Sequence, residues 1–84
     1  MPEITRFYGI VIKMYFKQSE HNPPHFHAIS NDCMGAFEIS TGKMIQGDLP
    51  ARAVKMVQEW AELHREELMK IWETQKFTEL PPLV

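Results

Sequence analysis

HNPPHFH, residues 21–27, is the stretch around which the rest of this chain is organised. Two successive prolines fix φ twice and remove two backbone donors, so the segment is a stiff, non-helical approach to whatever follows Pro24. Asn22 precedes a proline and is pushed out of the helical region as well. The stretch therefore predicts a loop that ends at Pro24 and a strand that begins at His25.

The residues from about 25 to 30, which follow the stiff Pro-Pro pair and precede the turn signal Asn31-Asp32, read as that strand. Alternation places His25 and His27 on one face and Phe26 on the other. Two imidazoles spaced this way lie about 6–7 Å apart, close enough to share a metal ion, a phosphate or a proton. The alternative is an edge strand with two solvated histidines. Because Phe26 has a large apolar side chain, its face of the strand is the better candidate for the core, and the histidine pair would then point away from the core.

The remaining strand signals lie on both sides of this motif. Residues 7–16 predict one long strand, because their even positions are apolar or aromatic throughout. Asn31-Asp32 predicts a turn, residues 35–40 a third strand, Thr41-Gly42 a second turn, and residues 43–46 a short fourth strand. Sequential strands usually lie side by side, so the sequence predicts a four-stranded antiparallel meander.

One long helix is expected over about residues 50–75, with Asp48 as the N-cap and Pro50 in the first turn. No glycine or proline interrupts residues 51–75, and one side of the helix is apolar. That side consists of Ala53, Val57, Trp60, Ala61, His64, Leu68 and Ile71. The tail, residues 77–84, contains two prolines and is expected to be extended. The predicted fold is a single α+β domain over residues 1–84, with the helix packed on one face of the sheet.

Composition limits the class of protein. The chain has 84 residues, of which 44% are hydrophobic and 24% charged, as expected for one small globular domain. A single cysteine excludes an intramolecular disulfide and a cysteine-rich zinc site. Neither a signal peptide nor a membrane span is visible, so we expect a soluble cytoplasmic protein. The net charge of −2 argues against nonspecific nucleic-acid binding.

The histidines are the candidate site residues. His64 falls in the middle of the apolar side of the helix, so a strand face carrying His25 and His27 could meet it. Three histidines are a known zinc set that leaves one position open for water. The catalytic candidates are thus His25, His27, His64 and Glu38. The candidate metal ligands are His25, His27, His64 and His21, which would bind a divalent metal such as zinc. The alternative for His64 is a core histidine bonded to a backbone carbonyl or to Glu38.

Several of these motifs together resemble a known family. They are Pro2-Glu3-Ile4 with Phe7-Tyr8-Gly9-Ile10, then His21-x-Pro23-Pro24-His25-x-His27, then Trp60-x-x-x-His64 before Glu67-Leu68 and Trp72. They resemble the small bacterial family catalogued as domain of unknown function 4160. That resemblance implies no established activity. It implies membership of toxin–antitoxin-like gene pairs, with a partner from another family.

Three classes of function follow. The first is an interaction or regulatory module that forms a homodimer or binds a protein partner. One helix covers only one face of a sheet, and the second face of the strand at 7–16 also carries the apolar residues Phe7, Val11 and Tyr15. A partner would cover that second face. The second is a hydrolase or nuclease that uses the histidines as metal ligands or as general acid and base. The third is a DNA-binding regulator. The sequence leaves open whether the protein is an enzyme.

Overall fold

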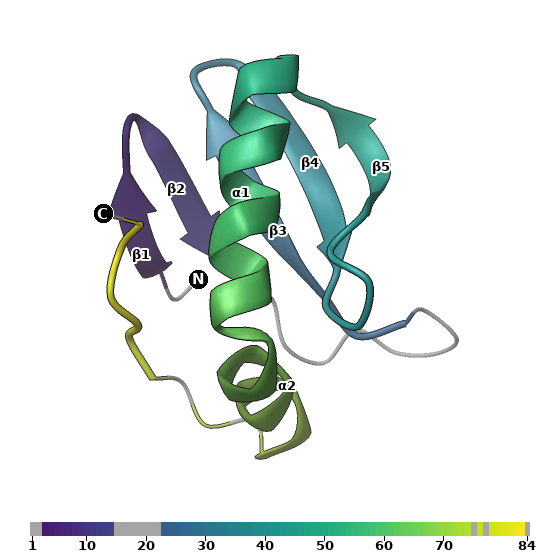
Figure 1. The fold of residues 1–84 in the computed structure, drawn as a ribbon, viewed down its shortest axis with the longest axis vertical. Helices are drawn as coiled ribbons and strands as arrows, with labels where there is room; N and C mark the ends of the chain where they lie inside the picture. The colour runs from purple at the N-terminus through teal and green to yellow at the C-terminus, as the bar shows by residue number, and fades with distance from the viewer. Residues whose placement is uncertain (1–2, 15–22, 75, 77, 84) are drawn as a thin grey trace.

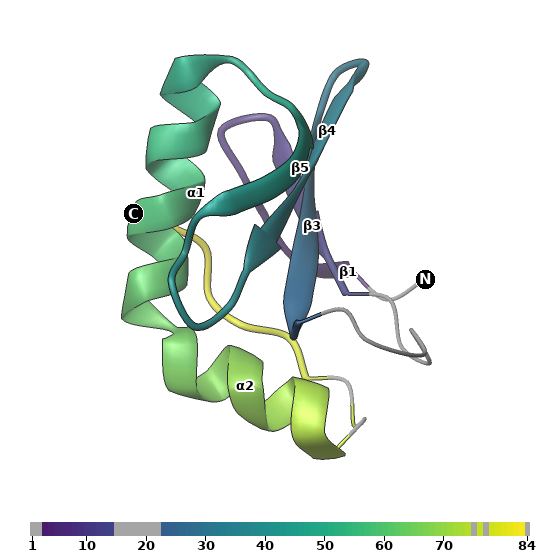
Figure 2. The same cartoon turned by 90° about the vertical axis from the view of Figure 1, so that its right-hand side faces the viewer.

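A five-stranded antiparallel sheet with one helix across a face and a second helix beneath one end forms the protein (Figures 1 and 2). The computed structural model describes residues 3–14, 23–74, 76 and 78–83. The elements in chain order are β1 (Glu3–Phe7), β2 (Ile10–Lys13), β3 (His25–Ser30), β4 (Cys33–Glu38), β5 (Met44–Asp48), α1 (Ala51–Leu63) and α2 (Arg65–Thr74). Neighbouring strands in the chain are neighbours in the sheet, so the predicted α+β class and the antiparallel meander are confirmed.

The first predicted strand is wrong, because it is a hairpin. Tyr8 and Gly9 both have positive φ, 48° and 78°, and Phe7 pairs with Ile10 across the turn. Positive φ at both central positions is the signature of the tight turn that suits the twist of a hairpin. The glycine in the middle of the predicted strand thus marks a turn, and the sheet has five strands instead of four. Residues 15 and 16 of the predicted strand lie outside the described residues.

The strand after the Pro-Pro pair has its predicted bounds, and the turn at Asn31 has a φ of 55°. The next two strands are shifted: β4 begins two residues earlier than predicted and β5 extends to Asp48. Asp48 is therefore a strand residue. The predicted N-cap is wrong: Pro50 occupies that position, without a side-chain cap hydrogen bond.

The predicted single helix is also wrong, because it breaks at His64, where φ is −120° and ψ is 24°. The carbonyl oxygen of His64 accepts the first hydrogen bond of α2, from the backbone N–H of Leu68 at 2.8 Å. Glu66 and Glu67 lie in the first turn of α2, where the helix dipole favours carboxylates. No breaker residue marks this junction. In the described part of the chain, no helix is long and apolar enough to cross a bilayer.

The break has a packing consequence. α1 lies across one face of the sheet, and α2 turns beneath the end of the sheet (Figure 2). A straight helix would continue past the sheet. The turned helix instead buries Leu68 and Ile71 in the core.

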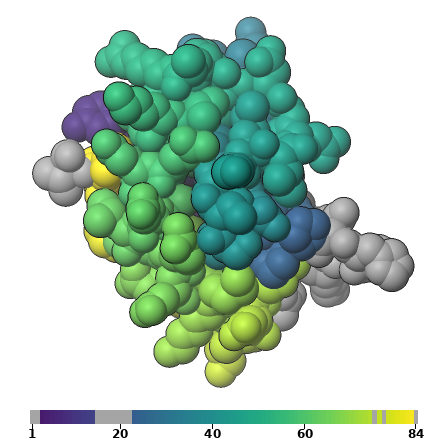
Figure 3. Space-filling view, turned by 45° about the vertical axis from the view of Figure 1, so that its right-hand side comes forward, coloured from purple at the N-terminus to yellow at the C-terminus, as the bar shows by residue number. Residues whose placement is uncertain are grey.

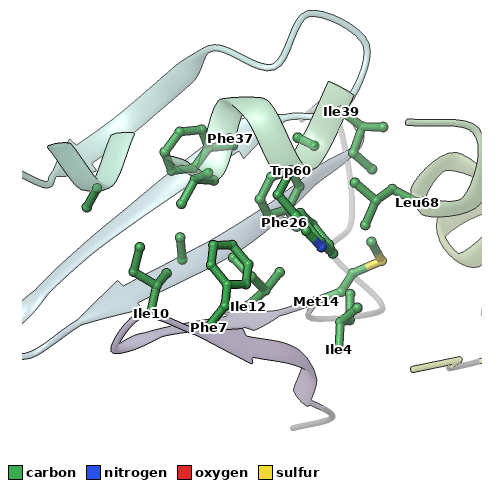
Figure 4. Packing of buried hydrophobic residues seen from close by; sticks show 14 of the residues in the cluster. Ile4, Phe7, Ile10, Ile12, Met14, Phe26, Phe37, Ile39, Trp60 and Leu68 are labelled. Carbon is green, nitrogen blue, oxygen red and sulfur yellow. The ribbon is translucent and has the colours of Figure 1, made fainter. Parts of the chain in front are cut away.

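Trp60 lies at the centre of the core (Figure 4). It is fully buried, and its ring centroid lies 6.0 Å from that of Phe7 and 5.9 Å from that of Phe26. Phe26 in turn stacks on Phe37 of the neighbouring strand at 5.5 Å. These contacts join α1 to three strands and fix which face of β3 is turned inward.

Candidate functional site

The two faces of β3 have different surroundings. Phe26 and Ala28 point toward α1 and have no exposed surface. His25, His27 and Ile29 alternate with them, so they lie on the opposite face of the sheet, away from α1. We call this the open face. The register of the strands places these further side chains on it: Glu3, Arg6, Val11, Lys13, Met34, Ala36, Glu38, Gln46 and Asp48.

His25 and His27 lie together on the open face, as the alternation predicts. Their ring centroids are 5.2 Å apart with an angle of 70° between the planes. His25 is 7% exposed, and its Nδ1 lies 2.8 Å from the carbonyl oxygen of Pro23. Since a carbonyl oxygen only accepts, Nδ1 carries the proton and Nε2 is left as the acceptor or ligand atom. The stiff Pro-Pro segment therefore fixes the orientation of this ring.

Trp72 of α2 contacts the same ring, with centroids 5.3 Å apart. The sequence indicates Trp72 only as a residue at the margin of the apolar side of the helix. The break at His64 directs α2 beneath the sheet and so brings Trp72 to His25. Because the break itself lacks a sequence signal, this contact could not be predicted.

His27 is only partly exposed, and burial lowers the pKa of its ring, with a smaller lowering by the neighbouring His25. The ring is therefore neutral at neutral pH. It borders a shallow hollow of about 210 Å³, which is lined by His27, Met34, Gly35, Ala36, Gln46 and Gly47. Small-molecule sites usually have about 300–1,000 Å³. The hollow suits one side chain of a partner better than a whole organic ligand.

Glu38, the predicted assisting carboxylate, is the cross-strand partner of His25 and shares its face. Its Oε1 accepts a hydrogen bond of 2.7 Å from the hydroxyl of Thr41. In the described part of the chain, the structure therefore brings Glu38 near the histidine pair without a hydrogen bond between Glu38 and His25.

His64 lies apart from the pair, at the junction of the helices. Its Nδ1 is 2.6 Å from Oε1 of Glu67, and its ring centroid is 5.2 Å from that of Trp60. Its partner is thus neither a backbone carbonyl nor Glu38. Within residues 3–14, 23–74, 76 and 78–83, no group of three or more His, Cys, Asp or Glu side chains is arranged to hold a metal ion. His21 lies outside those ranges, so metal binding or catalysis by these residues stays a prediction.

The open face also carries an apolar row that the sequence only partly indicated. Val11 was expected there, whereas Phe7 is buried against α1 and Tyr15 lies outside the described residues. Val11 and Ile29 are partly exposed, and Met34 is 49% exposed. Met34 was missed because β4 begins earlier than expected. A strand from Cys33 would have placed it beside Ile29.

The comparisons with known proteins give a family and nothing closer. A family model described as "Domain of unknown function (DUF4160)" matches residues 9–73, a range that contains the histidine pair and both sides of the helix junction. No curated protein and no protein of solved structure matches the chain.

Proposed function

This chain belongs to the DUF4160 family, which is defined without a known function, and we propose that it is a small protein-interaction module with a regulatory role. The open face is its binding surface. A regulator of this kind acts by covering a partner, so it needs a complementary surface and no catalytic group.

The observation that carries this proposal is the one-sided covering of the sheet. α1 packs on one face, whereas the other presents Val11, Ile29 and Met34 in a continuous row. Apolar side chains grouped on a surface and bordered by polar ones mark interaction sites. β5, an edge strand of the sheet, lies at the surface beside α1, and its Ile45 is 47% exposed (Figure 3).

The family resemblance adds a class of partner. Toxin–antitoxin-like pairs consist of two small proteins from neighbouring genes, and one binds the other. We propose that this chain is one half of such a pair. A domain of 84 residues with one sheet face available has the size and shape for that role.

The hydrolase hypothesis has weaker support. A histidine base needs a group that orients it and a nucleophile or water that it activates. A hydrogen bond to the carbonyl oxygen of Pro23 orients His25. The predicted assisting carboxylate, Glu38, accepts a hydrogen bond from Thr41 instead of contacting the histidine by a hydrogen bond. Among the described residues, the open face presents only Lys13 and Arg6 as cations, and Arg6 is paired with Glu3. A phosphate clamp of the kind that a nuclease needs is therefore not formed by the described residues.

Substitution of Met34 tests the proposal. Met34→Lys places a charge in the apolar row, and Glu59→Lys, on the exposed side of α1, is the matched control. Native mass spectrometry of complexes purified with the tagged chain should show loss of the bound protein, self or foreign, for Met34→Lys alone. Complexes that survive Met34→Lys unchanged would exclude the open face as the binding surface.

A further inference from the structure

We propose that the open face binds a second copy of this chain, face to face, about a twofold axis that runs along β3. This inference rests on the proposed function and names a partner for its surface. The feature that carries it is a separation of charge across the sheet, which makes the open face complementary to itself.

The charged side chains on the open face are separated by sign. Arg6 on β1 and Lys13 on β2 occupy one half, and Glu38 on β4 and Asp48 on β5 occupy the other. The exception is Glu3, which forms an ion pair of 3.0 Å with Arg6 of the same chain. Among the described residues, no cation lies within salt-bridge distance of Asp48. One half of the face is thus basic by one charge and the other acidic by two.

One row of side chains joins the two halves. Cross-strand pairing places Arg6 beside Val11, Val11 beside Ile29, Ile29 beside Met34, and Met34 beside Asp48. The row therefore has a basic end, three apolar residues, and an acidic end. Its central residue, Ile29, lies on β3, the middle strand of the sheet.

A twofold axis along β3 reverses this row in the second copy. Arg6 then faces Asp48 of the second copy, Asp48 faces Arg6 of the second copy, and the apolar centres meet. Lys13 falls over β4 of the second copy, which carries Glu38. Sheets that pack face to face keep their strand directions within about 30° of each other. The long Arg and Lys side chains can bridge the displacement between partner residues that this angle produces. The contact is isologous, as in most homodimers.

The size of the face sets the strength of the dimer. Five strands about 4.8 Å apart and about five residues long give on the order of 400 Å² in projection per copy. Stable interfaces bury about 800 Å² per partner. We therefore expect a weak dimer that dissociates on dilution, and the measurement must span micromolar to millimolar concentrations.

Charge reversal and its rescue test the proposal by sedimentation equilibrium of the full chain. Arg6→Glu and Asp48→Arg each act twice in a symmetric dimer, so each should raise the dissociation constant by about tenfold or more. The double variant exchanges the charges and should return to within about threefold of the unmodified chain. Glu59→Lys, on the exposed side of α1, should leave the constant unchanged. Circular dichroism checks that each variant is folded, and Arg6→Gln with Asp48→Asn replaces any variant that is not.

Three results would overturn the inference: a monomer at all concentrations, single reversals without effect, or a double variant that stays dissociated. These differ from failure of the proposed function. If the chain is monomeric and Met34→Lys abolishes a complex with a different protein, the open face is an interaction surface and only the choice of partner is wrong. If Met34→Lys affects no complex of either kind, both proposals fail.

Discussion

The indole Nε1 of Trp60 donates a hydrogen bond of 2.8 Å to the carbonyl oxygen of Pro81, so the centre of the core also holds the C-terminal segment. The backbone N–H of Leu80 donates to the carbonyl oxygen of Ile4 at 3.1 Å, which places the same segment along β1. Leu80 and Leu83 pack against the core. One side chain thus connects α1, the sheet and the segment that follows α2.

Truncation of Trp60 should therefore be costly. Trp60→Ala removes a fully buried indole and should lower the free energy of unfolding by about 3–5 kcal/mol. Glu62→Ala, on the exposed side of the same helix, should change it by less than about 0.5 kcal/mol. Chemical denaturation measures both. Equal effects would mean that Trp60 does not hold the core together.

Two glycines with positive φ offer a matched pair at the β4–β5 side of the sheet. Gly47 has a φ of +99°, and a Cβ there would overlap the backbone oxygen of Met34. Gly42 has a φ of +76° with open space around it. Gly42→Ala should cost about 1–2 kcal/mol from the left-handed backbone alone. Gly47→Ala should cost more, because the strands must also separate, and thermal unfolding of the two variants compares them. A smaller cost for Gly47→Ala would contradict the close approach of β4 and β5.

Local chemistry predicted much of the fold, and long-range packing decided the rest. The Pro-Pro pair and the alternation after it predicted β3 to the residue, because both act within a few positions. The hairpin at Tyr8-Gly9 was missed because apolar residues on both sides of a tight turn continue one alternating pattern. The break at His64 was missed because it depends on burying Leu68 and Ile71 beneath the sheet, which no local signal reports.

The candidate site divides in the same way. The shared face of His25 and His27 follows from strand periodicity, and so does their separation from Phe26. The contact of Trp72 with His25 depends on the direction of α2 and could not be predicted. His64 was expected in the middle of the apolar side of one continuous helix; it lies instead at the C-cap of α1, with its ring 5.2 Å from that of Trp60 and its Nδ1 hydrogen-bonded to Glu67 of α2.

The pKa of His27 predicts a pH dependence of stability. Its pKa is lowered in the folded protein from the ordinary histidine value of about 6.5, mainly by burial and then by His25, so the unfolded chain binds more protons below about pH 6.5. The contribution of the neutral His27 ring to the free energy of unfolding is fully present above pH 6.5 and is lost as the pH falls through the lowered pKa of the folded protein. His27→Gln should flatten this part of the profile of unfolding free energy against pH. Parallel profiles for the two proteins between pH 5 and 7 would rule out His27 as the source, since about 6.5 is the ordinary pKa of histidine.

Added Zn²⁺ should distinguish the histidine pair from His64. Because Nδ1 of His25 is hydrogen-bonded to Pro23, Nε2 is its ligand atom, and the ring of His27 lies 5.2 Å from that of His25. His64 lies in the helical layer, and its Nδ1 is hydrogen-bonded to Glu67. We therefore expect any Zn²⁺-dependent shift of imidazole resonances in NMR to affect His25 and His27 together and to leave His64 unchanged. His25→Gln should then abolish the response of His27, and His64→Gln should preserve it. Joint perturbation of all three rings by one equivalent of metal would contradict the arrangement described here, and would move the hydrolase hypothesis ahead of the interaction module.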